Sequence, residues 1–147
     1  MTMHRRPVGR ARLLAALGAL VTLAGTVLPW WTVGGHAGEL PASSGNAFES
    51  TGIIVFVAAL ATIALVTLPY ATDRPMQADR WQAYALVAVV GSAAFAYRIF
   101  DLAMLRAFSF AEPVEALTRA PGVWVTTIGL IVIARATYDT YREPHYR

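Results

Sequence analysis

Two oppositely charged side chains interrupt an apolar stretch in the second half of the chain. Arg98 and Asp101 lie three residues apart, so on a continuous helix they share a face and partly neutralise each other. A charge at mid-bilayer costs at least about 2.5–3.5 kcal/mol, and charged residues within apolar spans are therefore candidates for function. The pair predicts a pocket in which Arg98 holds an anionic lipid head group or substrate and Asp101 orients it. The alternative, which we favour, is an interfacial ion pair that sets the depth of the helix.

A second candidate feature is the sequence Pro29-Trp30-Trp31, which closes the first apolar stretch. Pro29 removes a backbone donor, and indole rings prefer the head-group level of a membrane, where the ring is apolar and its N–H stays hydrated. We interpret Trp30 and Trp31 as anchors in an aromatic belt, with a platform for a ligand as the alternative.

Other residue types exclude several kinds of chemistry. The absence of cysteine excludes disulfides, thiolate metal sites and thiol nucleophiles. His36 with Glu39 and Glu49 could be imagined as a metal site, but one histidine and two separated carboxylates on a glycine-rich segment favour a solvated loop. The remaining histidines lie in the terminal tails, which excludes paired haem ligands between helices. We therefore expect no metal, no cofactor and no catalytic activity.

The elements that must position these residues follow from the distribution of charge. Four windows, 13–31, 52–70, 82–97 and 122–134, contain none of the 12 basic and 9 acidic residues. Charge-free blocks of this length, joined by polar segments, are typical of a chain that crosses a bilayer several times. We expect an all-α, integral membrane four-helix bundle in a single domain. Its spans are 12–31, 52–70, 82–105 and 122–138, joined by outer loops 32–51 and 106–121 and an inner loop 71–81.

Basic residues predict the orientation of these spans. With the amino end inside, nine of the twelve arginines lie in inner segments, and Arg98, Arg106 and Arg119 remain outside. Because cytoplasmic flanks carry the excess of basic residues, both termini are predicted to be cytoplasmic. Aromatic residues agree, with an outer belt of Trp30, Trp31, Tyr97, Phe100 and Trp124 and an inner belt of Tyr70, Trp81, Tyr84, Tyr138 and Tyr141.

Small residues at a spacing of three or four mark faces on which membrane helices pack closely. Three spans carry such faces: Gly18, Thr22 and Gly25; Ala88, Ser92 and Ala96; and Gly122, Thr126 and Gly129. They predict a tight bundle or a seam between copies of the chain, although an alanine-rich composition also produces such stripes by chance.

The whole pattern resembles a known group of proteins. A basic amino end, an apolar first span, Leu28-Pro29-Trp30-Trp31-Thr32-Val33-Gly34, a Gly/Ser-rich outer loop and three further spans are similar to uncharacterised small four-span membrane proteins of GC-rich bacteria. One of that group is associated with tryptophan-operon regions. The resemblance implies a membrane fold and no activity. The use of arginine without lysine also suggests a GC-rich bacterial host.

Together these observations predict a non-catalytic protein of the plasma membrane. We expect an accessory or scaffold subunit that packs against itself or a larger membrane complex. The alternative is a transporter or a binding module for anionic lipids or small ligands that uses Arg98 and Asp101. The net charge of +3 is too small to suggest a nucleic-acid partner.

Overall fold

Four long helices account for most of the chain. The computed structural model describes residues 9–36, 38, 40–71, 81–108, 110 and 112–142. The long helices are α1 (Arg10–Val27), α2 (Gly52–Ala71), α3 (Trp81–Met104) and α5 (Pro121–Arg142). The shorter elements are α4 (Glu115–Arg119), a 3-10 turn η1 (Ala47–Glu49), and strands β1 (Trp31–Val33) and β2 (Ser43–Gly45). By length and composition, each of the four long helices can cross a membrane.

Prolines explain two of the helix ends. Helix α1 ends at Val27, earlier than the predicted boundary at 31, because Leu28 is extended and precedes Pro29. Helix α5 begins at Pro121, a position at which a missing backbone N–H costs no hydrogen bond within the helix. It continues through Arg135 to the last described residue, beyond the predicted end at 138. Helix α3 runs without interruption through both charges of the Arg98–Asp101 pair.

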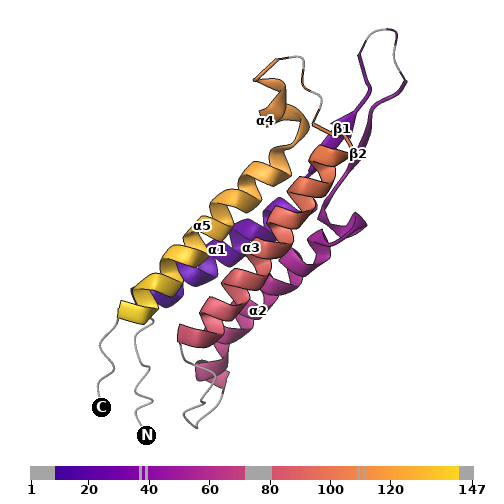
Figure 1. Ribbon diagram of the computed structural model, residues 1–147. Coiled ribbons are helices and arrows are strands. Elements are labelled where there is room, and N and C mark those ends of the chain that lie inside the picture. The colour runs from indigo at the N-terminus through magenta and orange to yellow at the C-terminus, as the bar shows by residue number, and fades with distance from the viewer. Residues whose placement is uncertain are drawn as a thin grey trace, which may run out of the picture.

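The long helices alternate in direction, and each lies beside the next in the chain (Figure 1). Helix α5 returns to pack against both α1 and α3, which closes the bundle. The start of α1 and the end of α5 therefore lie at the same end, called here the terminal end (Figure 1). The opposite end, which carries β1, β2 and α4, is called the ribbon end.

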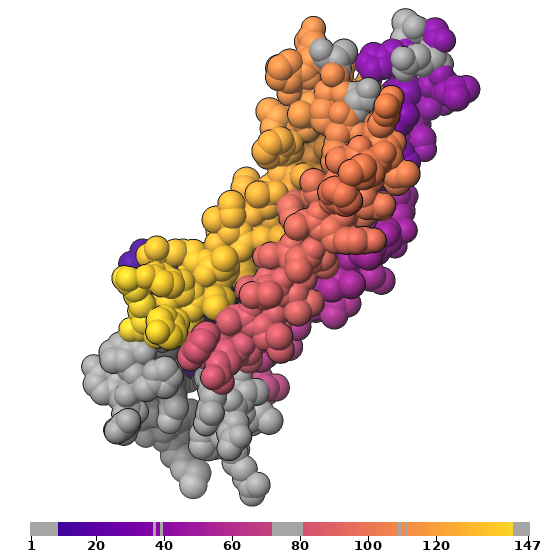
Figure 2. Space-filling model, in the orientation of Figure 1, coloured from indigo at the N-terminus to yellow at the C-terminus, as the bar shows by residue number. Residues whose placement is uncertain are grey.

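The body is elongated (Figure 2), and its core lies between the long helices. Its buried hydrophobic residues form three clusters, of which the ribbon-end cluster contains Trp30, Ala47, Val55 and Leu102. Many large apolar side chains point outward instead, among them Leu86, Ile131 and Leu13. A soluble monomer rarely exposes so much contiguous apolar surface, whereas lipid-facing helices do so by necessity.

The ribbon end differs from the expectation of helices joined by turns. Strands β1 and β2 pair antiparallel, with Thr32 opposite Ser44. The chain leaves β1 through Gly34 and Gly35, both at positive φ, where a side chain would be strained. Strands of three residues are too short to give a recognisable alternation in sequence. Most of the predicted inner loop, residues 72–80, lies outside the described residues.

Candidate functional site

Arg98 points into the bundle rather than toward its surface. Its side chain is 7% exposed. It lies on the same face of α3 as Gly91 and Leu102, which are also buried. A Cβ placed on Gly91 would lie 3.0 Å from the Cβ of Ala58 on α2. That close contact turns this face of α3, with Arg98 on it, toward the interior.

Asp101 connects the buried guanidinium to the surface. Arg98 Nη1 donates to Asp101 Oδ2 at 2.5 Å, and the Asp101 side chain is 37% exposed. This contact confirms the sequence prediction that the two side chains lie on one face of the helix. The pair forms a polar connection from the interior of the bundle to its outside.

The guanidinium of Arg98 retains an unused buried donor. An arginine side chain carries five N–H donors, and within the described part of the chain Arg98 Nε has no hydrogen-bond partner. A buried donor without a partner costs about 1–3 kcal/mol, and more when the group is charged. Arg98 Nε–H can therefore donate to an anionic oxygen of a carboxylate or phosphate, for which the planar guanidinium is well suited.

Trp30 is not an outer belt residue. Its side chain is fully buried and packs edge-on against Phe95 of α3, with 5.4 Å between ring centroids. The indole Nε1 donates to the carbonyl oxygen of Gly25 at 2.9 Å. Gly25 lies in the last turn of α1, where carbonyls lack a partner within the helix, so this hydrogen bond caps the helix. Because α1 ends early, the indole turns beneath the ribbon and closes the core instead of contacting lipid head groups.

Trp31 occupies a more accessible position at the ribbon end. It is partly buried, and its Nε1 donates to Glu49 Oε2 at 3.0 Å. This contact ties β1 to η1. The two tryptophans that the sequence placed together thus have different environments, one within the core and one at its edge.

A polar cluster joins the ribbon, meaning the paired strands β1 and β2 and the turn between them, to α4. Arg119 Nη1 donates to the carbonyl oxygen of Gly34 at 3.0 Å, and Arg119 Nη2 lies 2.7 Å from His36 Nε2. The same histidine nitrogen lies 3.2 Å from Glu115 Oε1. Glu49 contacts Trp31 and does not join His36, so this part of the imagined metal site is not formed. Glu39 lies outside the described residues. In the described ranges no three such side chains are close enough to hold a metal ion.

Two of the three small-residue faces meet each other. A Cβ on Gly25 would lie 2.6 Å from the backbone nitrogen of Thr126, and one on Gly129 would lie 2.6 Å from the nitrogen of Thr22. Gly18 and Gly122 complete this α1–α5 seam, with similarly short approaches to backbone atoms. The absence of side chains at the glycines is therefore what allows the two helices to approach.

The third face behaves differently. Ala88 is partly buried against the central core cluster, whereas Ser92 and Ala96 are exposed. Helix α3 contacts α2 through Gly91 instead, one position before Ser92. Among the helices that the structure describes, none packs against Ser92 and Ala96 on the outer part of this face.

The sequence did not single out Arg119 or the Trp30 cap. A recognisable signal existed for the cap, because an indole five residues after a glycine in the last helical turn can reach a free carbonyl. Arg119 and His36 are 83 residues apart, and no local pattern relates them. Comparison of the chain with protein-family models, with curated proteins and with solved structures finds no match.

Proposed function

We propose that the chain is a multi-pass protein of the plasma membrane in a GC-rich bacterium, with its four long helices crossing the bilayer and the terminal end in the cytoplasm. The support is the length and apolar composition of the helices together with their exposed apolar side chains. The arginine distribution favours the orientation, since nine of the twelve arginines flank the predicted inner side. Retention in membranes after alkaline extraction is the expected result, and release into the aqueous fraction would contradict insertion.

We further propose that the protein is a non-catalytic accessory or scaffold subunit that binds itself or a larger membrane complex through α3. One observation carries this proposal: the faces on α1 and α5 are used within the chain, whereas Ser92 and Ala96 remain exposed. Apolar surface alone gives little drive for association in lipid, so close backbone approach at small residues supplies van der Waals contact. The exposed part of α3 is the surface at which such an approach is sterically open.

The test enlarges these small side chains. Ser92→Ile with Ala96→Ile should abolish self-association or co-purification in mild detergent, measured by native mass spectrometry. Ala64→Ile is the matched control, because Ala64 is an exposed residue on α2. An unchanged assembly in the α3 variant, with its helicity and thermal unfolding intact, would contradict the proposal.

A second candidate function is a transporter or binding module for anionic lipids or small anions that uses Arg98 and Asp101. The unpartnered Nε of a buried arginine favours it. Arg98→Ala separates the two functions. If this variant keeps its fold and oligomeric state but loses binding of an anionic amphiphile or export of a solute, the scaffold proposal fails. If it only lowers expression, the pocket proposal fails.

A further inference from the structure

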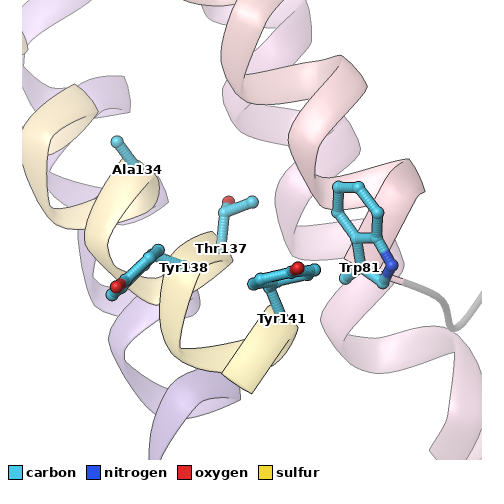
Figure 3. A pocket seen from close by; sticks show the side chains of 5 residues that line it. All are labelled: Trp81, Ala134, Thr137, Tyr138 and Tyr141. Carbon is cyan, nitrogen blue, oxygen red and sulfur yellow. The ribbon is translucent and has the colours of Figure 1, made fainter. Parts of the chain in front are cut away.

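An open groove lies between α3 and α5 at the terminal end. It has a volume of about 450 Å³ and is lined by Trp81 of α3 and by Ala134, Thr137, Tyr138 and Tyr141 of α5 (Figure 3). That volume is within the range of about 300–1,000 Å³ found for small-ligand sites. The four residues of α5 recur at helical spacing, so they form one continuous face.

The walls of this groove are apolar and aromatic. Trp81 and Tyr141 pack edge to face, with 5.1 Å between ring centroids, and Tyr138 lies on the other flank (Figure 3). Thr137 Oγ1 donates to the carbonyl oxygen of Ile133 at 2.9 Å, so its hydroxyl is already used by its own helix. The groove therefore offers apolar contact along α5 and aromatic rings toward the end of the bundle.

Two arginines border the groove through Tyr138. The guanidinium carbon of Arg142 lies 4.5 Å from the Tyr138 ring centroid, and that of Arg135 lies 5.8 Å from it. Asp139 partly neutralises Arg135, with a distance of 3.2 Å between Arg135 Nε and Asp139 Oδ1. For Arg142, by contrast, no carboxylate partner is recorded among the described residues, and its side chain is exposed. Among the described residues, the side of the groove at Tyr138 therefore carries a net positive charge.

The aromatic walls and the two arginines together indicate which ligands the groove can bind. Aromatic rings alone would suit a quaternary ammonium group, but two guanidinium groups on the same ring repel a cation. An anion with an attached apolar chain satisfies both parts of the groove. In the membrane orientation proposed above, tyrosine and tryptophan at this level face the boundary between hydrocarbon and head groups.

We propose that this groove binds an anionic phospholipid of the cytoplasmic leaflet. The phosphate pairs with Arg142, assisted by Arg135, and the start of an acyl chain lies along Ala134 and Thr137. The inference rests on the proposed membrane insertion and is independent of the α3 contact face and of Arg98.

Native mass spectrometry from mild detergent tests the charge requirement. The protein is mixed with phosphatidylglycerol or with phosphatidylcholine of the same acyl chains, and the retained lipid is counted. We expect phosphatidylglycerol to be retained at least about five-fold better. Arg142→Gln should reduce its retention about five-fold, the factor that corresponds to about 1 kcal/mol for a basic residue at an anionic surface. Arg10→Gln is the control, because Arg10 is an exposed arginine of α1 at the same end.

A second pair of variants tests the groove itself. Ala134→Phe fills the groove without changing its charge and should lower retention of phosphatidylglycerol. Ile128→Phe should leave it unchanged, because Ile128 is exposed on α5 but does not line the groove. Equal retention of the two lipids by the unmodified protein, or full retention by a folded Ala134→Phe variant, would overturn the proposal. If the protein resists alkaline extraction but shows either result, only the proposed lipid site is refuted. If alkaline treatment extracts the protein, membrane insertion is refuted.

Discussion

The close approach of α1 and α5 makes Gly129 the most informative position for a single methyl group. In Gly129→Ala the new Cβ would lie 2.6 Å from the backbone nitrogen of Thr22 and 2.8 Å from the carbonyl oxygen of Gly18. Favourable contacts between non-bonded heavy atoms lie near about 3.5–4.0 Å. The nearest atom to the new Cβ is the side-chain oxygen of Thr22, but these two atoms belong to the α1 backbone. No rotamer change relieves their overlap, so the helices must separate.

The magnitude follows from two opposing terms. Overpacking costs about 1–3 kcal/mol, and a contact with backbone on a facing helix belongs at the upper limit. Alanine has a higher helix propensity than glycine, which stabilises the helix by about 1 kcal/mol. We therefore expect Gly129→Ala to lower the free energy of unfolding by about 2 kcal/mol, measured by circular dichroism during titration of mild-detergent micelles with a denaturing detergent.

Gly91→Ala is the matched control for this experiment. Its new Cβ would lie 3.0 Å from a side-chain methyl group, that of Ala58, and its next neighbour would lie at 3.7 Å. The cost is smaller and the gain in helix propensity is the same, so the net change in stability should stay within about 1 kcal/mol. If Gly129→Ala proves as stable as Gly91→Ala, the backbone contact between α1 and α5 is not as close as described.

Three further predictions concern polar contacts. Trp30→Phe leaves the carbonyl of Gly25 buried without its donor and should destabilise the protein by about 1–3 kcal/mol in the same titration, and unchanged stability would contradict the capping role. Arg98→Met should be neutral or stabilising, whereas Asp101→Ala leaves a buried charge unpaired and should cost about 3–5 kcal/mol. The opposite order of the two midpoints would refute this assignment. Arg119→Ala should accelerate amide hydrogen exchange at residues 32–45, measured by mass spectrometry, with little change in global stability, because it unties the ribbon from α4. Unchanged exchange there would show that the cluster does not hold the ribbon.

The sequence predicted the helices well because their signal is local. Windows without charge, and the apolar residues that continue past Arg98, depend on residues close in the chain, and the predicted spans 52–70 and 82–105 match α2 and α3 to within one residue at each end. The seam was predicted in part: Gly25 and Gly129 were recognised as contact residues, but their spacing could not show that the two faces meet each other. That pairing depends on the arrangement of all four helices.

The errors arise where orientation about a helix axis decides the outcome. The sequence placed Arg98 and Asp101 on one face of a helix but could not show that the contact of Gly91 with α2 turns Arg98 inward. Trp30 was assigned to a belt from the general preference of indoles for interfaces. Because α1 ends at Val27 and the carbonyl of Gly25 is free to accept a hydrogen bond, Trp30 lies in the core instead. The inward turn of Arg98 depends on a contact with another helix and has no local signal, whereas the Trp30 cap could be recognised only once the end of α1 was known.

The crossing of the membrane by four helices is the claim on which the proposals depend, and labelling of single cysteines in intact cells tests it most directly. The natural chain contains no cysteine, so each introduced thiol reports one position without background. With a membrane-impermeant maleimide, Ala42→Cys and Glu112→Cys at the ribbon end should react in intact cells. Ala71→Cys and Tyr141→Cys at the terminal end should react only after permeabilisation. Reaction of Tyr141→Cys from outside, or equal reaction of all four positions, would contradict the proposed topology.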